Sequence, residues 1–421
     1  MNPRATVDAI ASDAAVGLSA APTRGLTPGL VAVFAAACGL TVANIFYAQP
    51  LIGLIAPALG LHAALAGLVI ALTQVGYGTG LLLLVPLSDV TENRRLVTTA
   101  LGVVVIGLIG IATSRSALVF LAFSFLVGMS AVATQVLVPF ISHLAPDASR
   151  GKAVGNVMAG LLTGIMLARP WSSYVAATLG WRAVFYISAA MMAALLVVLR
   201  RVLPERRPAA GVSYLELMRS LPALVARTPL LRRRAFYQGM MFAGFNVFWT
   251  GSPLLLASVF GLDHRGIALF ALAGAAGALS APVAGRLADR GLTRPATGFA
   301  LLAALVASAI FLWAGRTASL ALLVVGALVL DAAVQVCQVL SLRSLYMLAP
   351  ELRGRLNGLF IAFAFACGAT GSALAAAAYT WCGWSALAGL VGVFAVAALL
   401  MYASEFGPAP RGAPRMAPSD G

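Results

Sequence analysis

The chain has 421 residues, of which 61% are hydrophobic and only 10% are charged. An ordinary soluble domain is about 45–50% apolar and about 25% charged, so this chain cannot cover the surfaces of the roughly three soluble domains that its length would allow. The formal net charge of +15 does not indicate nucleic acid as a partner, because the basic residues stand in short runs between apolar stretches rather than on one solvent face. The composition predicts an integral membrane protein.

Residues that could hold a metal or perform catalysis are sparse and scattered. The cysteines lie within apolar stretches without metal-ligand spacing, and the histidines stand near the ends of different predicted helices. These residues are Cys38, Cys337, Cys367, Cys382, His62, His143 and His264. The sequence also lacks a phosphate-binding Walker motif. We therefore expect no metal, no cofactor and no enzymatic activity.

Apolar stretches long enough to cross a membrane recur along the chain. A helix needs about 20 mostly apolar residues to cross a hydrocarbon core of about 30 Å, whereas a membrane β-barrel would show segments of about ten residues with alternating polarity. The sequence predicts an all-α integral membrane fold with twelve transmembrane helices. They are expected near 29–56, 63–88, 95–113, 117–144, 153–177, 182–203, 235–259, 266–288, 296–315, 318–347, 356–380 and 384–403.

Basic residues concentrate in alternate connections between these helices. With the N-terminus inside, 22 of the 28 Lys and Arg residues fall on the cytoplasmic side, as the positive-inside rule requires. This distribution predicts that both termini are cytoplasmic. Because Arg dominates over a single lysine, Lys152, we expect a bacterial protein, located in the inner membrane. The long central connection contains an amphipathic stretch from Ser213 to Arg227, which we expect to lie on the membrane surface.

The two parts of the chain share landmarks at a nearly constant offset of about 203 residues. Asn44-Ile45-Phe46-Tyr47 matches Asn246-Val247-Phe248-Trp249, Arg150-Gly151 matches Arg353-Gly354, and Gly180-Trp181 matches Gly383-Trp384. Six helices followed by six related helices in the same orientation are one recurring plan of secondary transporters, with substrate bound near the midplane between the halves. The predicted units are a cytoplasmic tail 1–28, a six-helix bundle 29–203, a linker 204–233, a second six-helix bundle 234–403 and a cytoplasmic tail 404–421.

The residues around these landmarks resemble the major facilitator superfamily over nearly the whole chain. Its signature between helices 2 and 3 is matched in part by 85–95 and, more fully at its start, by 285–291. The stretches 44–51 (NIFYAQPL), 76–89 and 331–357 are most similar to bacterial drug and sugar efflux permeases of the arabinose-efflux-like group. The antiporter signature of helix 5 is present in part, as Gly155, Gly160 and Gly164 without its Gly-Pro. The resemblance implies two six-helix bundles, alternating access and efflux by antiport.

Asp331 lies near the middle of the predicted helix 318–347. A carboxylate at that depth costs roughly 2.5–3.5 kcal/mol on insertion scales, so an acid inside a membrane helix is a functional candidate. Gln335 and Gln338 follow on the same helical face and predict a cavity wall that binds substrate. We expect Asp331 to load and release a proton. The alternative is an acid satisfied by neighbouring hydroxyls, with a packing role only.

Arg169 lies deep in the predicted helix 153–177, where a buried guanidinium needs a counter-charge or an anionic ligand. Three interpretations remain open: an ion pair with Asp331 between the two bundles, an anchor for an anionic substrate, or a side chain that reaches the outer interface. Arg343, in contrast, is expected to extend its side chain to the cytoplasmic interface.

Amides and aromatics at repeat-equivalent places predict a polar lining for a cavity at the midplane. The residues assigned to substrate binding, besides Gln335 and Gln338, are Asn44, Tyr47, Gln49, Gln135, Asn246 and Trp249. Packing alone is the alternative for the aromatic residues among them.

Acidic and basic residues recur at the cytoplasmic ends of helices 2–3 and 8–9. Ion pairs there, supported by helix termini, predict a cytoplasmic gate. Its residues are Asp89, Arg94, Arg95, Asp289, Arg290 and Arg294.

Two functional hypotheses follow. The first is proton-coupled efflux of a small amphipathic solute such as a drug, sugar or metabolite, with Asp331 protonated in one access state. The second is an organic-anion uptake or exchange carrier in which Arg169 holds the substrate. In both, the expected partners are a small molecule, protons and the lipid bilayer, and we expect a monomer.

Overall fold

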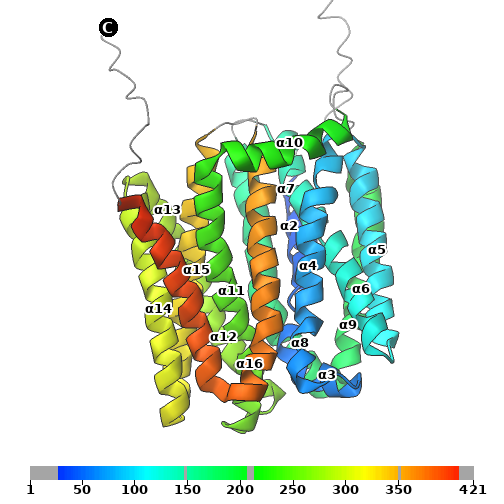
Figure 1. Ribbon diagram of the computed structural model, residues 1–421. Coiled ribbons are helices and arrows are strands. Elements are labelled where there is room, and N and C mark those ends of the chain that lie inside the picture. Colours follow the sequence, from blue (N-terminus) through cyan, green and yellow to red (C-terminus); the bar gives the residue numbers. More distant parts are fainter. Residues whose placement is uncertain (1–26, 147–148, 206–212, 349–351, 407–421) are drawn as a thin grey trace, which may run out of the picture.

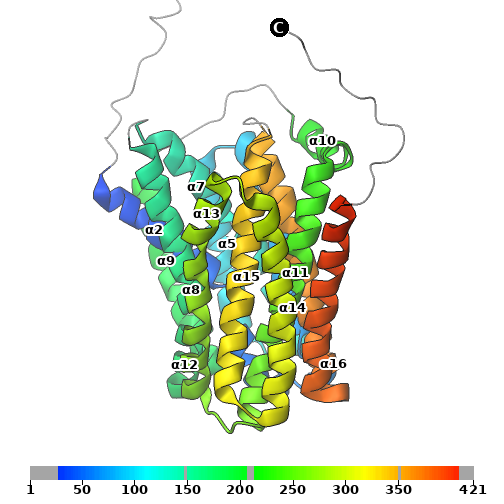
Figure 2. The same cartoon turned by 90° about the vertical axis from the view of Figure 1, so that its left-hand side faces the viewer.

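The computed structural model describes residues 27–146, 149–205, 213–348 and 352–406. Over these ranges the chain consists of helices and connections, without a β-strand, and its long helices stand side by side (Figures 1 and 2). The predicted all-α fold class is confirmed. The predicted tails 1–28 and 404–421 lie almost entirely outside the described residues, as does the middle of the predicted linker.

The first half begins with a helix that breaks near its centre. α2 (Pro28–Ala43) stops before Asn44, and the chain continues through a short 3-10 turn, η1 (Gln49–Leu51), into α3 (Ile52–Ala58). The remaining elements of this half are η2 (Ala63–Leu65), α4 (Leu68–Leu83), η3 (Pro86–Asp89), α5 (Asn93–Thr113), α6 (Ala117–Ser130), α7 (Ala133–Leu144), α8 (Arg150–Leu179) and α9 (Trp181–Val202).

The second half follows a linker helix, α10 (Tyr214–Arg227). Its elements are α11 (Pro229–Ser258), α12 (His264–Ala275), η4 (Ala276–Ser280), α13 (Ala281–Asp289), α14 (Thr293–Thr317), α15 (Leu320–Tyr346), α16 (Arg353–Ala403) and η6 (Ser404–Phe406). α16 contains a break at Gly383, where the backbone leaves helical geometry.

Two repeat-equivalent glycines account for one of the sequence landmarks. Gly180 has φ 84° and Gly383 has φ 71°, conformations that a residue with a Cβ atom adopts only at a cost. Each glycine turns the chain between the last two long helical segments of its half. The repeated Gly-Trp pairs therefore mark the same turn in both halves.

Nine helical segments among the described residues are long and apolar enough to cross a membrane. The last of them, Arg353–Phe406, spans 54 residues and includes the break at Gly383. The broken segments α2–α3 and α12–η4–α13 occupy two further places where the sequence predicts a crossing. The multi-pass arrangement is confirmed, and the full count of twelve spans stays a prediction.

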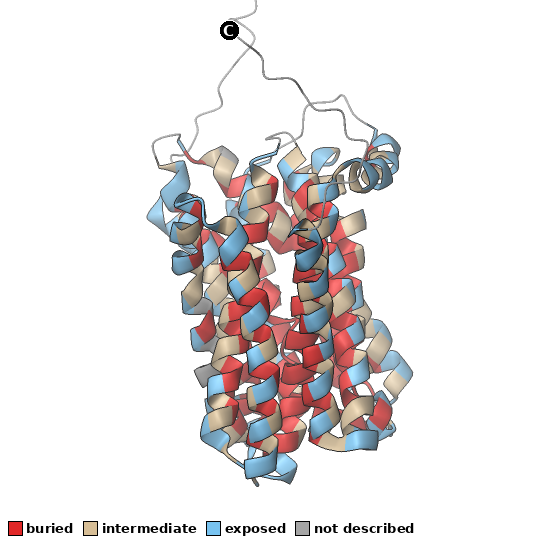
Figure 3. Cartoon of the chain, turned by 60° about the vertical axis from the view of Figure 1, so that its left-hand side comes forward, coloured by how far each residue is buried: buried red, intermediate tan, exposed pale blue. Residues whose placement is uncertain are grey.

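Buried apolar side chains form two main cores. One runs from Val31 to Leu203 and also includes Ala362 and Phe365 from α16, and the other runs from Tyr237 to Ala398. Large apolar side chains also face outward, such as Leu118, Phe299 and Trp313, and Figure 3 shows exposed and buried positions alternating along each helix. An apolar exterior around a packed interior is the pattern of a helix bundle in lipid.

Glycines bring two helices of the first half into close contact. A Cβ atom on Gly39 of α2 would lie 2.5 Å from the carbonyl oxygen of Gly160 in α8, and one on Gly160 would lie 2.5 Å from the carbonyl oxygen of Ala35. Small residues at such crossings let membrane helices pack backbone to backbone. Gly160 and Gly164, two of the predicted antiporter-signature glycines, serve this packing, whereas Gly155 faces open space.

α10 lies across one end of the bundle (Figure 1). A capping box formed by Ser213 and Glu216 starts the helix, Leu217 is buried, and the Tyr214 hydroxyl donates to the Leu83 carbonyl oxygen of α4 at 3.0 Å. Part of the amphipathic stretch that the sequence assigns to a membrane surface thus packs on protein, while Leu215 is exposed. We call this end of the molecule the α10 end and the other the opposite end.

Candidate functional site

A cavity of about 470 Å³ lies between the two halves at the α10 end. Its wall comes from the α4–η3–α5 segment, α7 and α8 of the first half, from α15 and α16 of the second half, and from Leu217 and Leu221 of the linker helix. The wall combines leucine, valine and isoleucine side chains with nine polar or charged residues, and apolar walls with placed polar groups are the usual make-up of a small-molecule site.

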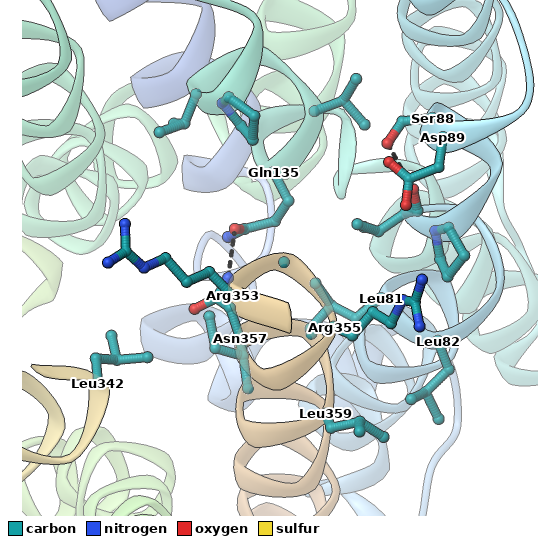
Figure 4. Close-up of a pocket in the computed structure, with 18 of the residues that line it drawn as sticks. Leu81, Leu82, Ser88, Asp89, Gln135, Leu342, Arg353, Arg355, Asn357 and Leu359 are labelled. Atoms are coloured by element: carbon teal, nitrogen blue, oxygen red, sulfur yellow. Dashed lines mark hydrogen bonds between the residues drawn. The ribbon is translucent and has the colours of Figure 1, made fainter. Parts of the chain in front are cut away.

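A chain of hydrogen bonds crosses this cavity from one half to the other. The Tyr346 hydroxyl of α15 donates to Asn357 Oδ1 at 3.0 Å, and Asn357 Nδ2 of α16 donates to Gln135 Oε1 of α7 at 3.4 Å. Gln135 Nε2 then donates to the Tyr77 hydroxyl of α4 at 3.1 Å. Figure 4 shows the Gln135–Asn357 bond at the centre of the cavity. Gln135, one of the predicted substrate residues, thus lines the cavity, and its role in substrate binding stays a prediction.

The charged residues of the cavity wall are Asp89, Arg353 and Arg355. The two arginines extend to opposite sides of the Gln135–Asn357 bond (Figure 4). Arg353 Nε donates to the Tyr346 carbonyl oxygen at 3.0 Å. The sequence reasoning included Asp89 only as a gate residue and gave Arg353 and Arg355 no role beyond topology.

Beyond the cavity, toward the opposite end, buried polar side chains join the two halves. Gln49 Nε2 of η1 donates to Asn246 Oδ1 of α11 at 3.2 Å, and Gln74 Nε2 of α4 donates to the same oxygen. Ser372 of α16 donates in turn to Gln74 Oε1 at 3.2 Å. We call these four residues together with Arg169 the inter-half network.

Arg169 of α8 joins this network through Gln49 of its own half and is only 4% exposed. Its Nε donates to Gln49 Oε1 at 2.7 Å, and its guanidinium carbon lies 4.5 Å from the centroid of the Trp249 ring. Phe46 and Phe245 also present their rings to it, at 5.2 Å and 5.1 Å. Cation–π contacts of this kind are strongest when desolvated. The buried Nη2 of Arg169 has no hydrogen-bond partner among the described residues.

Trp249 stands between Arg169 and the acid that the sequence singles out. Its Nε1 donates to Asp331 Oδ1 at 2.9 Å, while its ring face carries the guanidinium of Arg169. No ion pair within 4.0 Å joins Arg169 to Asp331 in the described part of the chain. The Arg169 side chain thus lies inside the protein rather than at the outer interface. It is bonded to an amide and linked to Asp331 through an indole.

Close packing fixes the position of Asp331 on its other side. A Cβ atom on Gly277 of η4 would lie 2.5 Å from the Asp331 Cβ atom and 2.9 Å from the Ala332 nitrogen. The carboxylate is 8% exposed, and it is the one buried acid among the described residues.

The predicted substrate residues divide into three groups. Gln135 and Gln338 line the cavity, and Gln49, Asn246 and Trp249 belong to or adjoin the inter-half network. The others face elsewhere: Asn44 accepts from Ser188 Oγ of its own half at 2.6 Å, and Tyr47 packs on Trp171 with ring centroids 4.8 Å apart. Gln335 is half-buried and does not line this cavity.

The predicted gate residues lie at the α10 end, and three of them pair within a single half. Arg94 pairs with Glu205 at 3.4 Å, Asp289 with Arg343 at 2.5 Å, and Arg294 with Glu405 at 3.4 Å. Arg343, which the sequence predicts to extend to the cytoplasmic interface, therefore also pairs with an acid. Asp89 lines the cavity, and Arg95 and Arg290 are exposed.

The chain was compared with known families and structures. The family described as Major Facilitator Superfamily matches residues 30–347 and 239–419. The chain belongs to the major facilitator superfamily. Among its relatives are the uncharacterized transporter YgaY of Escherichia coli O157:H7, 37% identical over 382 residues that cover 90% of this chain and 96% of the relative, and the probable transporter SCO4007 of Streptomyces coelicolor, 33% identical over 362 residues covering 85% and 83%.

Two solved structures share this superfamily fold. The human organic anion transporter MFSD10 (TETRAN) has a TM-score of 0.64 at 20% identity, covering 91% of this chain and 99% of that one. A single-residue mutant of the nucleoside transporter NupG has a TM-score of 0.68 at 15% identity, covering 89% and 99%. At these identities the likeness shows the fold alone. The arabinose-efflux-like subgroup within the superfamily stays a prediction, because the relatives at 33–37% identity are named only as transporters.

Several residues of this superfamily member escaped sequence reasoning. Ser372, Asn357 and Tyr346 each carry an inter-half or cavity bond. The available signal was a polar residue on a largely apolar helix, which many helices show.

Proposed function

We propose that this protein is a secondary active transporter that exports a small amphipathic solute by proton antiport, working by alternating access between its two halves. The membrane-transporter part of this statement follows from the family. The coupling ion, the direction and the solute are the proposal.

The observation that carries the proposal is the position of Asp331. It is a buried carboxylate within an apolar helix, and one hydrogen bond, from Trp249, connects it to the Arg169 side of the inter-half network. A carboxylate in such a place is costly when charged, so a proton arriving at Asp331 removes that cost. Protonation also weakens a bond that is charge-assisted while Asp331 is ionised, and it changes the partner of the indole that supports Arg169.

The asymmetry of the two ends supports alternating access. A cavity lies between the halves at the α10 end, whereas buried side chains bond the halves together beyond it. Because the α10 end carries the Arg-rich segments, the positive-inside rule makes it cytoplasmic. The structure would then be an inward-facing state, from which a solute of the cytoplasm enters before export. A bacterial inner membrane, cytoplasmic termini and a monomeric transporter belong to the same proposal.

The proposal is tested in proteoliposomes that contain a pH-sensitive dye. A panel of sugars, cationic drugs and organic acids is added to wild type, to Asp331→Asn, and to Asp263→Asn as a control that removes an exposed carboxylate. We expect at least one compound to move protons through wild type and the control but not through Asp331→Asn. Solute movement without a pH change, or normal coupling in Asp331→Asn, would contradict proton antiport through this residue.

One observation favours the second hypothesis, an organic-anion uptake or exchange carrier. Arg169 is buried without a carboxylate partner, and its Nη2 lacks a hydrogen bond to any described residue, as expected for a group that awaits an anion. Arg169 does not line the cavity at the α10 end, so such an anion would reach it only after the inter-half network opens. An anion flux that persists in Asp331→Asn and is abolished in Arg169→Gln would favour this carrier.

A further inference from the structure

The charged wall of the cavity points to the chemical class of the solute. Arg355 of α16 lines the cavity and is half-buried, yet it forms no hydrogen bond or ion pair with any residue that the structure describes. A guanidinium carries five N–H donors and no acceptor. In this partly desolvated position the Arg355 guanidinium therefore has N–H donors free to bind an anion.

The neighbouring amides can add donors to the same site. Asn357 Nδ2 and Gln135 Nε2 each use one hydrogen along the chain of bonds toward Tyr77, and each amide nitrogen has a second hydrogen. Each amide oxygen receives one bond and keeps a second lone pair, so the amides alone favour neither sign of charge. The wall holds two arginines against one acid, Asp89, and the arginines extend to either side of the amides (Figure 4), so the net charge of the wall favours an anion.

The rest of the wall suits an apolar body. Leu81, Leu82, Leu161, Leu342 and Leu359 all line the cavity. A volume of about 470 Å³ lies within the range of pockets that enclose small organic molecules, about 300–1,000 Å³. A purely polar solute would leave these leucines facing water.

The repeat shows that this arginine is not simply a consequence of topology. Lys152 occupies the position equivalent to Arg355 in the first half, two residues after the Arg-Gly landmark. It is exposed and does not line the cavity. Charge on the cytoplasmic side explains both residues equally, whereas only Arg355 is turned into the space between the halves.

We propose that the cavity at the α10 end binds an amphipathic organic anion, whose head is held by Arg355 and by the amides of Gln135 and Asn357 while its apolar body rests on the leucine wall. This inference rests on the proposed transport function, and it names the solute class for that function. It assigns recognition to Arg355 in this conformation rather than to Arg169, which lies outside the cavity wall.

The test is equilibrium binding to the purified full-length protein in detergent, without a pH gradient. The probes share a naphthalene ring with a short side chain that ends in a carboxylate, a carboxamide or an ammonium group, and calorimetric titration is corrected with protein-free micelles. We expect wild type to bind the carboxylate about tenfold more tightly than the carboxamide, as a charge-assisted bond provides. The ammonium probe should bind most weakly.

Variants then assign the preference to one side chain. Arg355→Gln should bring the carboxylate and carboxamide affinities to within about twofold of each other, and Arg355→Lys should retain part of the difference because it keeps the charge. Lys152→Gln, which removes the same charge at the repeat-equivalent position, should bind as wild type does. Thermal melting of each variant reports whether it is folded. The comparison of the three probes on wild type tests the proposal without any variant.

Equal affinity of wild type for all three probes, or a preference for the ammonium probe, would overturn the proposal. So would equal effects of Arg355→Gln and Lys152→Gln. None of these results depends on proton coupling, which the Asp331→Asn experiment measures separately. The solute class and the transport mechanism can therefore fail independently.

Discussion

Replacing Gln49 by alanine should loosen the closure of the opposite end. The variant loses the bond from Arg169 Nε to Gln49 Oε1 at 2.7 Å and the bond from Gln49 Nε2 to Asn246 at 3.2 Å. The bond to Arg169 lies within the first half and persists when the halves separate, so only the neutral bond to Asn246, which contributes about 0.5–1.5 kcal/mol, affects the closure. We expect a shift of about 1 kcal/mol toward the open state, or roughly fivefold in the equilibrium between closed and open.

The measurement is the distance distribution between two spin labels at the opposite end. One label is attached at Ala63, between α3 and α4, and the other at Val259, after α11, both exposed positions on different halves. The exposed native Cys382 is first replaced by serine. Wild type should give mainly short distances, and Gln49→Ala should add a population at longer ones. Gln49→Glu should add the same population, because its carboxylate keeps the bond to Arg169 within the first half but has no hydrogen to donate to Asn246.

Gln335→Ala is the matched control, since Gln335 is half-buried and forms no bond between the halves within the described part of the chain. If Gln49→Ala and Gln335→Ala give the same distribution as wild type, the inter-half network does not hold this end closed. A shift of equal size in both variants would show that the loss of an amide, rather than of the bond to Asn246, opens it.

Two glycine substitutions test close packing, each beside a glycine with open space. Gly277→Ala places a Cβ atom 2.5 Å from the Asp331 Cβ atom, whereas Gly285→Ala meets nothing within 4 Å. Because overpacking costs about 1–3 kcal/mol, proton-coupled transport should fall about tenfold or more in Gly277→Ala and stay unchanged in Gly285→Ala. Gly160→Ala places its Cβ atom 2.5 Å from the Ala35 carbonyl oxygen, whereas Gly155→Ala meets nothing. The melting temperature should drop by a few degrees in Gly160→Ala only, and equal melting of the two variants would contradict the packing argument.

Hydropathy was sufficient to predict an all-helical, multi-pass membrane fold, because the cost of placing polar groups in lipid acts on each segment independently of its partners. The same reasoning found Asp331 and Arg169, since a charged residue stands out against an apolar helix without any knowledge of its neighbours. It also placed Gln135 and Gln338 in a cavity wall. Each of these inferences depends only on the sequence of a single helix.

What joins one helix to another was not predictable in this way. Asn44 and Asn246 occupy equivalent places in the repeat, yet Asn44 bonds Ser188 within its own half and Asn246 bonds Gln49 and Gln74 of the other half. The difference depends on which helix faces each amide. Periodicity shows which residues share a helix face, but not which other helix packs against that face. For the same reason the sequence suggested a direct pair between Arg169 and Asp331, where the structure has Trp249 between them.

The polar nature of the inter-half network bears on how readily the proposed transporter changes state. If the halves were held at the opposite end by interlocked apolar side chains, opening would expose that surface to water at about 25 cal/mol for each Å², with nothing in the open state to offset the cost. Amides and hydroxyls such as Gln49, Gln74 and Asn246 exchange their partners for water, so each bond contributes only about 0.5–1.5 kcal/mol net. The closed and open states can then lie within a few kcal/mol of each other, the range in which the binding of a solute or a single proton shifts their populations. Arg169 is the exception, because its charge gains most from rehydration, and we expect the network to open around it first.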